Sequence, residues 1–340
     1  MLLPQRRQVT AALLGFGNVG RAFVRYLQSP EAANHSSIKL IAVADSSGGL
    51  LLNNNSTIQR LLVHKESGRI LADFASGEII KDSAEFIRAI RAEGVSYLIE
   101  SLPTNIADGQ PALDLIIAAL EQGLNVVTVD KGPLVHGFER LKEAAQKGGA
   151  RLEYSGTTGV GIPDQLAGDR VLEIRGVLNG TTNHILSEMQ GGEMSFDEAM
   201  ANAQADGIAE PDPALDIHGW DTASKVLILA KTLMGAQCQL AEVSRIGIGP
   251  ETESLIRIGR ESGRVVRLVG RARIWQGRVR VSVAPKLVEP DSPFYSVSGT
   301  SKAAVFRTEQ QGSILTQARS GRDAISQTIL DDIVRITSEL

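Results

Sequence analysis

VTAALLGFGNVGRAFVRYLQ, residues 9–28, decides the fold of the first half of this chain. Its first six residues, Val9 to Leu14, form a short apolar run with β-branched members, which is typical of a buried strand. The glycine-rich hexapeptide Gly15–Gly20 follows, and residues 21–28 then show helical spacing. A second buried-strand pattern, IKLIAVAD, ends at Asp45. Strand, glycine turn, helix and strand with a terminal acid together predict a dinucleotide-binding unit.

The glycines of GFGNVG have separate mechanical roles in such a turn. Gly15 is expected to make the tight turn, Gly17 to let the backbone approach a pyrophosphate, and Gly20 to let the helix pack closely on its strand. The helix N-terminus then offers free N–H groups and a positive dipole end to the phosphates. The hexapeptide alone also fits an ordinary turn, and the flanking pattern favours the nucleotide site. The predicted cofactor contacts in this turn are Gly15, Phe16, Gly17, Asn18, Val19 and Gly20.

Asp45 bears on the choice of cofactor. A carboxylate at this strand end accepts a hydrogen bond from the ribose 2′-OH of NAD and repels the 2′-phosphate of NADP. Ser46 and Ser47 are small donors beside it, and Lys65 is not far along the chain, so these residues also suit a 2′-phosphate. A strand-end acid without a ligand is a third interpretation. The sequence predicts NAD or NADP and leaves the preference open.

Two further strand patterns run into polar loops. VSYLIES leads into LPTN, NVVTVD leads into KGPL, and residues 111–122 between them have a helical pattern. Because parallel sheets bind ligands at the carboxyl ends of their strands, Thr104, Asn105 and Lys131 are expected to meet the cofactor and substrate. Ordinary turn residues and a solvated lysine are the alternative.

The second half carries the candidate catalytic residues. Residues 155–159 are small and indicate a loop with an accessible backbone, and VLEIRGVLN, residues 171–179, alternates as a strand does before GTTN and a helical run. In residues 203–230, an acidic loop leads into a predicted helix from Trp220 to Ala230. The acids there are Glu210, Asp212, Asp216 and Asp221.

Asp221 and Lys225 lie four positions apart, which places both side chains on one face of the predicted helix. At that spacing the usual interpretation is a surface salt bridge worth about a few tenths of a kcal/mol. The acidic loop that precedes the pair favours a site instead. Clustered carboxylates repel and need cations nearby, either lysines or a substrate ammonium.

The remaining segments, VVRLVGRARI, RVRVSVAPKLV and KAAVFRTE, alternate as antiparallel strands whose arginines face solvent. Residues 320–340 read as a glycine turn and an amphipathic helix. The net charge of −4 gives no electrostatic footprint for nucleic acid or an anionic membrane. The single thiol, Cys238, fits a reducing compartment, and the apolar run before Gly15 is too short to cross a bilayer. We expect a cytoplasmic protein that binds neither nucleic acid nor membrane.

The motifs together resemble one family, the homoserine dehydrogenases. GFGNVG, SLPTN, DKGPL, SGTTGVGIP, VLNGTTNHIL and AQADGIAEPDPALDIHGWDTASKVLILA occur in that family's order and spacing, and the last two are the most specific. The resemblance covers nearly the whole chain and is closest to the short form, without an N-terminal kinase or a C-terminal regulatory domain. It implies an oxidoreductase that interconverts L-homoserine and L-aspartate 4-semialdehyde with NAD(P), in threonine and methionine biosynthesis.

The resemblance also implies an α/β fold, with a Rossmann-like nucleotide-binding domain and a second α+β catalytic and dimerisation domain. The expected limits are residues 1–150 for the NAD(P)-binding domain and 151–310 for the catalytic and dimerisation domain. Residues 311–340 are expected to return to the nucleotide-binding domain. A homodimer is expected, built from the alternating strands after Val265.

The resemblance implies a role for each matching residue. Lys225 is expected to donate and accept the proton at the substrate oxygen, and Asp221 to orient the substrate. Glu210 is expected to bind the ammonium group of this amino-acid substrate. The other predicted substrate-binding residues are Asp216, Lys131 and Thr181. The other predicted cofactor-binding residues are Asp45, Ser46, Thr104, Lys131, Gly207 and Gly321. The backbone around Ser155, Thr158, Val160 and Ile162 resembles the family's site for a monovalent cation, Na⁺ or K⁺.

Several positions depart from the family pattern. Asp130 stands where asparagine is usual and adds a negative charge beside Lys131. Ser155 replaces a frequent glutamate at the cation site, and Lys302 replaces a common asparagine. The segment GRDAIS also deviates, so Gly321 is a weaker match as a cofactor contact.

Other functions fit parts of the sequence. An aspartate-semialdehyde dehydrogenase needs a nucleophilic cysteine, and Cys238 lacks an obvious activating motif. A non-catalytic NAD(P)-binding sensor would keep the glycine turn without need of the Asp221–Lys225 pair. A related aldehyde or alcohol oxidoreductase would share both features.

Overall fold

Two six-stranded sheets organise the chain in the computed structural model, which describes residues 9–33, 38–52, 55–74, 77–192, 194–319 and 321–338. They belong to two units, Met1–Thr157 with Gly321–Leu340, and Thr158–Ser320. The expected limits at residues 150 and 310 differ from these for two reasons. Strand β6 (Leu152–Glu153) still pairs with β5 (Asn125–Thr128) in the first unit, and β12 (Ser313–Arg319), which the sequence analysis did not predict, pairs with β11 (Ser301–Thr308) in the second.

The sheet of the first unit has the order β3-β2-β1-β4-β5-β6. Its neighbouring strands are parallel except for the antiparallel pair β2–β3. The strands β1 and β2 have the bounds that the sequence predicted. The bounds are β1 (Val9–Leu14), β2 (Ile38–Asp45), β3 (Gly48–Leu51) and β4 (Tyr97–Glu100).

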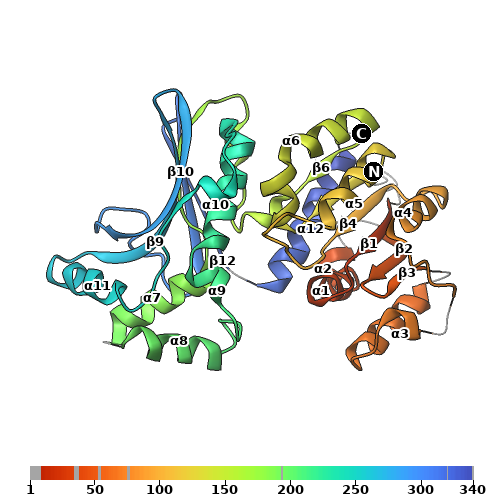
Figure 1. The fold of residues 1–340 in the computed structure, drawn as a ribbon, viewed down its shortest axis with the longest axis horizontal. Coiled ribbons are helices and arrows are strands. Elements are labelled where there is room, and N and C mark those ends of the chain that lie inside the picture. The colour runs from red at the N-terminus through yellow and green to blue at the C-terminus, as the bar shows by residue number, and fades with distance from the viewer. Residues whose placement is uncertain are drawn as a thin grey trace, which may run out of the picture. The chain divides into compact units, whose positions relative to one another are not determined.

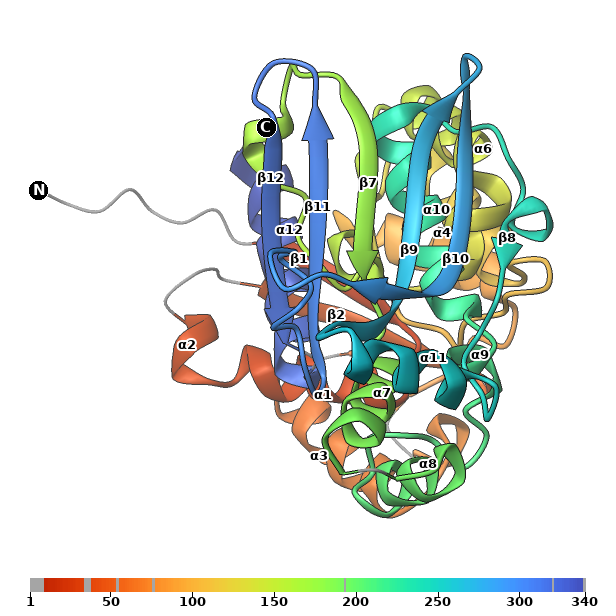
Figure 2. The same cartoon turned by 90° about the vertical axis from the view of Figure 1, so that its left-hand side faces the viewer.

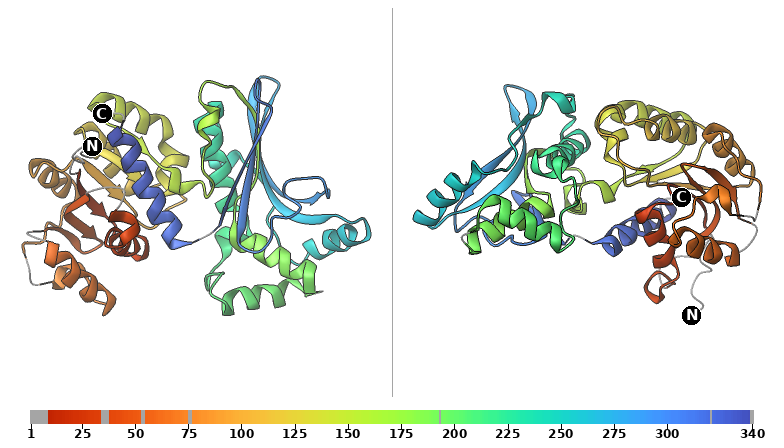
Figure 3. Two further views of the ribbon diagram at one scale, coloured as in Figure 1. Left: turned by 180° about the vertical axis from the view of Figure 1, so that it is seen from behind. Right: turned by 60° about the horizontal axis from the view of Figure 1, so that its bottom comes forward.

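Helices cover both faces of this sheet (Figures 1 and 3). The helices are α1 (Asn18–Leu27), α2 (Pro30–Ala33), α3 (Asn55–Glu66), α4 (Ser83–Ala92), α5 (Ala112–Glu121), α6 (Lys131–Gly148) and α12 (Arg322–Ser338). Residues of α1, α3 and α12 share one core with the face of the sheet that carries Tyr97, Ile99 and Val127. Since strand side chains alternate, Leu98 and Glu100 point to the other face.

Helix α12 completes the first unit although it follows the second unit in sequence. It supplies four side chains to the core of the first unit, all of them at most 1% exposed: Ile329, Leu330, Ile333 and Ile336. Tyr97 on β4 also forms a hydroxyl hydrogen bond of 2.9 Å with Thr337. The predicted return of the C-terminal segment is therefore built by apolar burial.

The sheet of the second unit has the order β12-β11-β7-β9-β10-β8. Its neighbours are antiparallel except for the short parallel pair β8–β10. Gln276 and Gly277 have φ values of 50° and 73°, which suits the two-residue hairpin between β9 and β10. The bounds are β7 (Val171–Val177), β8 (Ser244–Arg245), β9 (Val265–Trp275) and β10 (Arg278–Val288).

Helices α7, α10 and α11 pack on one face of this second sheet. Gly270 on β9 allows the close approach of α10, because a Cβ there would lie 3.1 Å from Thr222 and 3.2 Å from Val226. The helices of this unit are α7 (Gly180–Gly192), α8 (Phe196–Ala205), α9 (Ala214–Ile217), α10 (Trp220–Met234) and α11 (Thr252–Glu261). No helix in the described ranges is long and apolar enough to cross a membrane.

The opposite face of the second sheet is rich in arginine. Figure 2 shows this side of the sheet, with its long strands in front of α10. Glu173 on β7 accepts a hydrogen bond of 2.5 Å from Arg271 Nε, and its other carboxylate oxygen lies 3.5 Å from Arg307 Nε. On β12 of the same sheet, Leu315 is 46% exposed.

Candidate functional site

The glycine turn joins β1 to α1. Gly15 has a φ of +105°, which glycine adopts at low cost, so it makes the tight turn as predicted. A Cβ on Gly15 would lie 2.5 Å from the carbonyl of Ser101, and Ser101 Oγ donates a 2.8 Å hydrogen bond to the Gly15 carbonyl. The turn is therefore held directly against the end of β4.

Gly20 and Gly17 have contrasting surroundings. A Cβ on Gly20 would lie 2.2 Å from the Gly15 carbonyl oxygen and 3.1 Å from the Leu13 side chain, so α1 approaches β1 more closely than any other residue would allow. A Cβ on Gly17 would meet no described atom within 4 Å beyond its chain neighbours. The backbone at Gly17 thus borders open space, as the close approach of a phosphate requires.

The N–H groups of this turn divide into two sets. Gly15 and Phe16 both donate to the carbonyl of Ala44, at 2.9 and 3.0 Å. These two N–H groups are used between the strands, although both residues were predicted to contact the cofactor. The first turn of α1, beginning at Asn18, has N–H groups without intrahelical acceptors, and its N-cap Gly17 brings no side chain to satisfy them. An anion is best placed there.

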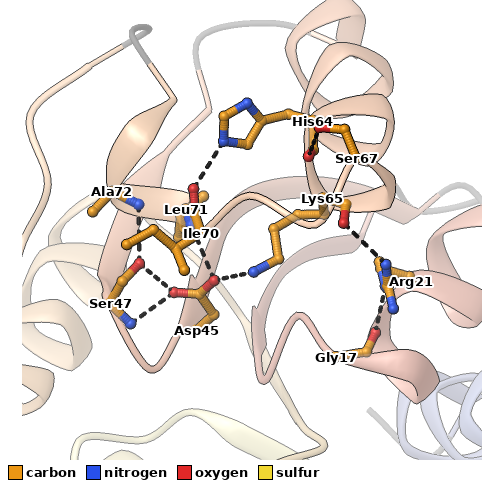
Figure 4. A network of polar contacts seen from close by, with 10 residues as sticks. All are labelled: Gly17, Arg21, Asp45, Ser47, His64, Lys65, Ser67, Ile70, Leu71 and Ala72. Atoms are coloured by element: carbon orange, nitrogen blue, oxygen red, sulfur yellow. Dashed lines mark hydrogen bonds and ion pairs between the residues drawn. The ribbon is translucent and has the colours of Figure 1, made fainter.

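Asp45 lies in a dense polar network at the end of β2 (Figure 4). Its Oδ1 accepts hydrogen bonds from the N–H of Ser47 at 2.8 Å and from the Ser47 hydroxyl at 2.6 Å. Its Oδ2 accepts from the ammonium of Lys65 and from the N–H of Leu71 at 3.1 Å. A carboxylate has about four acceptor positions, and all are occupied here. A ribose 2′-OH must therefore displace one of these donors.

Electrostatics keep Asp45 ionised. Burial opposes its charge, but the hydrogen bonds from Lys65, Ser47 and Leu71 outweigh burial and lower the pKa of Asp45. The ion pair with Lys65 is largely shielded, with side-chain exposures of 15% for Lys65 and 9% for Asp45. Lys65 is therefore held against the Asp45 carboxylate at the end of β2.

Arg21 links the glycine turn to α3. Its Nε donates to the carbonyl of Gly17 at 3.2 Å, and its Nη1 donates to the carbonyl of Lys65 at 3.3 Å (Figure 4). Ser46, also predicted to contact the cofactor, is exposed at the same strand end.

The loops after β4 and β5 meet at one edge of the sheet. Thr104 and Lys131 are both half-buried, and Lys131 is the first residue of α6. A Cβ on Gly132 would lie 2.5 Å from the carbonyl oxygen of Asn105, so the two loops touch backbone to backbone. The Asn105 amide is used inside its own loop, where it donates to Asp108 at 2.8 Å.

A second polar cluster lies in the other unit, between the end of β7 and the start of α10. Lys225 Nζ donates to Asp221 Oδ2 at 2.5 Å and to the carbonyl of Leu178 at 2.9 Å. Asn179 Nδ2 lies 2.6 Å from Asp216 Oδ1 and 2.7 Å from Asp221 Oδ2. The structure thus brings together Lys225 and two of the predicted acids.

The interpretation of Asp221 and Lys225 as a surface salt bridge is wrong. Each side chain is 13% exposed, and both have further polar partners in the two residues that follow β7. Burial and the charge of Asp221 raise the pKa of Asp216 above its ordinary value, although Asn179 and Lys225 act in the opposite direction. The cluster therefore concentrates negative charge around one ammonium.

Asn179 is the functional candidate that the sequence analysis missed. It bridges Asp216 and Asp221, and its Oδ1 accepts a 2.8 Å hydrogen bond from the N–H of Thr182. This cap is why α7 already begins at Gly180, within the GTTN segment expected to precede the helix. The usable signal was a polar residue at the carboxyl end of a predicted strand, next to the most specific motif.

The remaining predicted site residues lie outside this cluster or at its margin. Thr181 donates to the carbonyl of Ile208 at 3.2 Å and also lowers the pKa of Asp216 through a side-chain hydrogen bond. Glu210, Gly207 and Gly321 are exposed. Within the described ranges, the Glu210 side chain has no hydrogen bond or ion pair, so the structure does not join it to Asp216 and Asp221.

Cys238 does not have the surroundings of a nucleophile. It is a free, partly exposed thiol, and burial raises its pKa above the ordinary value. A reactive cysteine needs a stabilised thiolate, which is the opposite shift. This observation weighs against the chemistry of an aspartate-semialdehyde dehydrogenase.

The predicted cation loop is divided between the two units. Ser155 belongs to the first unit, where its N–H donates to Asp332 Oδ2 at 3.0 Å. Thr158, Val160 and Ile162 belong to the second, where the Thr158 hydroxyl donates to the carbonyl of Val160 at 2.6 Å. Among the residues that the structure describes, no group of three or more His, Cys, Asp or Glu side chains is placed to hold a metal ion.

Comparison with known proteins identifies the family of the chain. Residues 15–155 match the family model described as homoserine dehydrogenase, NAD binding domain. Residues 161–334, just over half of the 340 residues, match the model described as homoserine dehydrogenase. The chain belongs to the homoserine dehydrogenase family. The family is one of oxidoreductases that act on a CH–OH group, which is the predicted reaction class.

Three of the matching proteins align along almost their full length. The enzyme of Methanocaldococcus jannaschii is 31% identical over 334 residues, covering 95% of this chain and 97% of that one. The NAD(+)-dependent homoserine dehydrogenase of Pseudomonas canavaninivorans is 33% identical over 346 residues, covering 96% and 95%. The crystal structure of a putative homoserine dehydrogenase from Archaeoglobus fulgidus matches with a TM-score of 0.83 at 28% identity, covering 96% and 99%. These matches confirm the predicted α/β fold.

Proposed function

We propose that the protein interconverts L-homoserine and L-aspartate 4-semialdehyde, with Lys225 as the general acid and base and NAD as the preferred cofactor. The observation that carries the proposal is the buried network of Asn179, Asp216, Asp221 and Lys225. It gives a homoserine dehydrogenase the group its reaction needs, a proton acceptor held rigidly on a helix.

Oxidation of the alcohol removes a hydride from carbon and a proton from oxygen. The nicotinamide, when bound, supplies the hydride chemistry. Lys225 takes the proton in its neutral form, and in the reverse direction its ammonium donates the proton and stabilises the developing alkoxide. Two of the three ammonium N–H groups are directed at Asp221 and Leu178, which leaves one for the substrate oxygen.

The charge of the cluster suits the rest of the substrate. Asp216 and Asp221 face one ammonium, so one carboxylate is left to attract the ammonium group of homoserine. We propose Asp216, Thr181 and Glu210 as substrate contacts, with Glu210 reaching the ammonium group from an exposed position. Lys131 is the proposed contact for the substrate carboxylate.

The cofactor is proposed to bind at the glycine turn. The open space at Gly17 and the unsatisfied first turn of α1 support a pyrophosphate there. Asp45 favours NAD, because it repels the 2′-phosphate of NADP. The ammonium of Lys65 attracts that phosphate, so both cofactors are expected to react. The other proposed cofactor contacts are Phe16, Asn18, Val19, Gly20, Ser46, Thr104, Lys131, Gly207 and Gly321.

The cation site is the part of the family pattern that these residues fit least well. A Cβ on Gly159 would lie 3.2 Å from Lys302 Nζ, so a protein ammonium already lies against the proposed loop. A fixed positive charge competes with Na⁺ or K⁺ for nearby carbonyls. The proposed mechanism therefore uses no cation.

We also propose that the protein is a homodimer and that it acts in the cytoplasm. The face of the second sheet around Glu173 supports a homodimer, because an exposed sheet face with apolar Leu315 is suited to association. The single thiol Cys238 fits a reducing compartment, and we propose the cytoplasm.

A turnover assay tests the reaction. The purified protein is incubated with L-homoserine and either NAD⁺ or NADP⁺, and reduced cofactor is followed by absorbance. We expect turnover with both cofactors and a higher kcat/KM with NAD⁺. Binding of NADH without turnover would instead support the sensor, and turnover of other alcohols but not homoserine would support a related oxidoreductase.

A further inference from the structure

Glu100 is a buried carboxyl group that the proposed reaction does not use. It is the last residue of β4 and is 0% exposed. Its Oε1 accepts a hydrogen bond from the N–H of Leu102 at 2.6 Å, and its Oε2 lies 2.5 Å from the hydroxyl oxygen of Thr128, a contact to which a protonated carboxyl can donate. Both oxygens are therefore engaged at the carboxyl edge of the sheet, beside the loops proposed to meet the cofactor.

Asp130 is a second buried carboxyl group, joined to the first through Thr128. It is 1% exposed, and its N–H donates to Thr128 Oγ1 at 3.0 Å. Its Oδ1 accepts from the N–H of Gly132 at 2.9 Å, which caps α6. Its Oδ2 is buried and has no hydrogen-bond partner among the described residues.

Two buried carboxylates whose charges act on each other cannot both remain charged at low cost. Burial, together with the charge of Asp130, raises the pKa of Glu100 to about 8. Burial also raises the pKa of Asp130, which the N–H of Gly132, the Thr104 hydroxyl and the charge of Lys131 partly offset.

The helices packed on this face add little compensating charge. On α5, Asp114 is largely exposed and paired with Arg140 of α6. On α6, His136 Nε2 lies 2.8 Å from the carbonyl of Ile106. Lys131 is thus the cation whose charge acts on Asp130.

We propose that Glu100 and Asp130 share one proton, held on Glu100, and that this pair positions Lys131 and the loop after β4 to bind the cofactor. The assignment of the proton follows from location. Asp130 caps α6, where the helix dipole and a backbone N–H favour a negative charge, and Lys131 is adjacent. Glu100 has neither a helix end nor a cation of its own. Only the cofactor part rests on the proposed function.

The pair holds two segments of backbone, and the residue after Glu100 holds a third. Through Leu102 the pair holds the loop after β4, through Gly132 it holds the start of α6, and next to Glu100 the Ser101 hydroxyl holds the glycine turn. A second negative charge would push the ends of β4 and β5 apart. We therefore expect Glu100 and Asp130 to act as positioning residues that do not touch the reacting atoms.

The pH dependence has a definite sign. Because the raised pKa belongs to an acid, Glu100 is neutral below about pH 8 and ionises above it. The pair is intact at neutral pH and is lost as the pH rises. If binding requires the protonated form, the Kd for NADH rises by up to about tenfold per pH unit beyond that point.

The first experiment observes the proton directly. Protein carrying glutamate labelled with ¹³C at the side-chain carboxyl is titrated by NMR, and the Glu100 resonance is assigned by its absence in Glu100→Gln. We expect this carboxyl to stay protonated at pH 7 and to titrate near pH 8, and to titrate at lower pH in Asp130→Asn. An ionised Glu100 at pH 7, or a titration that Asp130→Asn does not move, overturns the shared proton.

The second experiment measures positioning without turnover. NADH affinity is followed by fluorescence from pH 6.5 to pH 9 in the wild type, in Glu100→Gln and in the surface control Glu139→Gln. Glutamine mimics the protonated acid and keeps an acceptor for Leu102, so its Kd should stay near the neutral-pH value throughout. The NADH affinity of Glu139→Gln should fall with rising pH as that of the wild type does.

The two failures can be told apart. If Glu100→Gln keeps the pH dependence of the wild type, the positioning role is wrong even though NADH binds. If NADH binds to none of the proteins, the proposed function fails, while the NMR titration still decides where the proton lies.

Discussion

Asp221 and Lys225 are both carried by α10, and the partners that fix them, Leu178 and Asn179, lie together at the end of β7. Their geometry therefore depends on one helix and one strand end of the second unit. This arrangement makes the acid–base assignment testable by single substitutions that leave the cofactor unit untouched.

Lys225→Ala is expected to abolish most turnover while NADH still binds. Loss of a general acid–base group typically lowers the rate by about 10²–10⁴-fold. Steady-state kinetics with homoserine and NADH fluorescence titration measure the two effects. Lys231→Ala removes a lysine farther along α10 and serves as the control, with near-normal kcat expected. A folded Lys225→Ala variant that turns over normally would remove Lys225 from the mechanism.

The Asp45–Lys65 pair should set cofactor preference through opposing charges. Removing the carboxylate in Asp45→Ala frees Lys65 for the 2′-phosphate and should shift kcat/KM toward NADP. Removing the ammonium in Lys65→Ala frees Asp45 Oδ2 for the ribose and should shift it toward NAD. A close charge contact in a partly solvated site is worth about 1–4 kcal/mol, so each shift should be about fivefold or more.

Arg25→Ala is the matched control for that pair of variants. It breaks a neighbouring ion pair with Glu66, but both side chains there are well exposed, at 53% and 43%. Its NAD-to-NADP ratio should equal that of the wild type. If the ratio stays constant in all three variants, Asp45 is only a strand-end acid and the cofactor argument fails.

At the scale of elements, two glycines of the turn between β1 and α1 have different roles. Gly20 is expected to be needed for stability, and Gly17 for cofactor binding. Gly20→Ala should destabilise the protein by roughly 1–3 kcal/mol, because its Cβ would overlap the Gly15 carbonyl. Gly17→Ala meets no such obstacle and should change stability by less than about 0.5 kcal/mol.

NADH binding completes the comparison of the two glycine variants. If the pyrophosphate approaches the backbone at Gly17, the added methyl group should weaken NADH binding in Gly17→Ala without lowering the melting temperature. Calorimetry and fluorescence titration measure the two quantities. A Gly17→Ala protein with wild-type affinity would place the phosphate elsewhere.

The elements with strong periodicity could be predicted from sequence, and those shaped by distant partners could not. Strands β1 and β2 have their predicted bounds because a buried parallel strand needs a continuous apolar run. Strand β12 was missed, because SILTQAR is a half-exposed strand that depends on pairing with β11. Helix α7 begins earlier than its helical sequence pattern, because the Asn179 side chain accepts a hydrogen bond from the first turn and so stabilises a helix start in residues of low helix propensity.

The candidate site shows the same division. Asp221 and Lys225 follow from a spacing within one helix, and sequence alone could place them together. Asp216 was also among the predicted acids, because it lies just before the same helix. Asn179 joins them only through tertiary contact, since β7 and α10 are separated by other helices in the chain. Glu100 gave no signal at all, because a lone acid at the end of an apolar strand shows nothing about burial.

At the scale of the whole molecule, the arginine-rich face of the second sheet predicts the oligomeric state. Light scattering should give about twice the chain mass of 36.3 kDa. Leu315→Asp places a charge on this face and should shift the population toward the single-chain mass. Val63→Asp changes a more exposed apolar residue on α3 of the first unit, 67% exposed, and should leave the mass unchanged. A single-chain mass for the unmodified protein would end the dimer proposal.

The return of α12 to the first unit has a consequence for how the protein is made. A ribosome adds about 5–20 residues per second, so the segment between Thr157 and Gly321 takes roughly 10–30 s to synthesise. During that interval the apolar surface around Tyr97, Ile99 and Val127 has emerged without the helix that will cover it. The second unit can fold first, and the nascent first unit offers chaperones a binding surface until its last helix arrives.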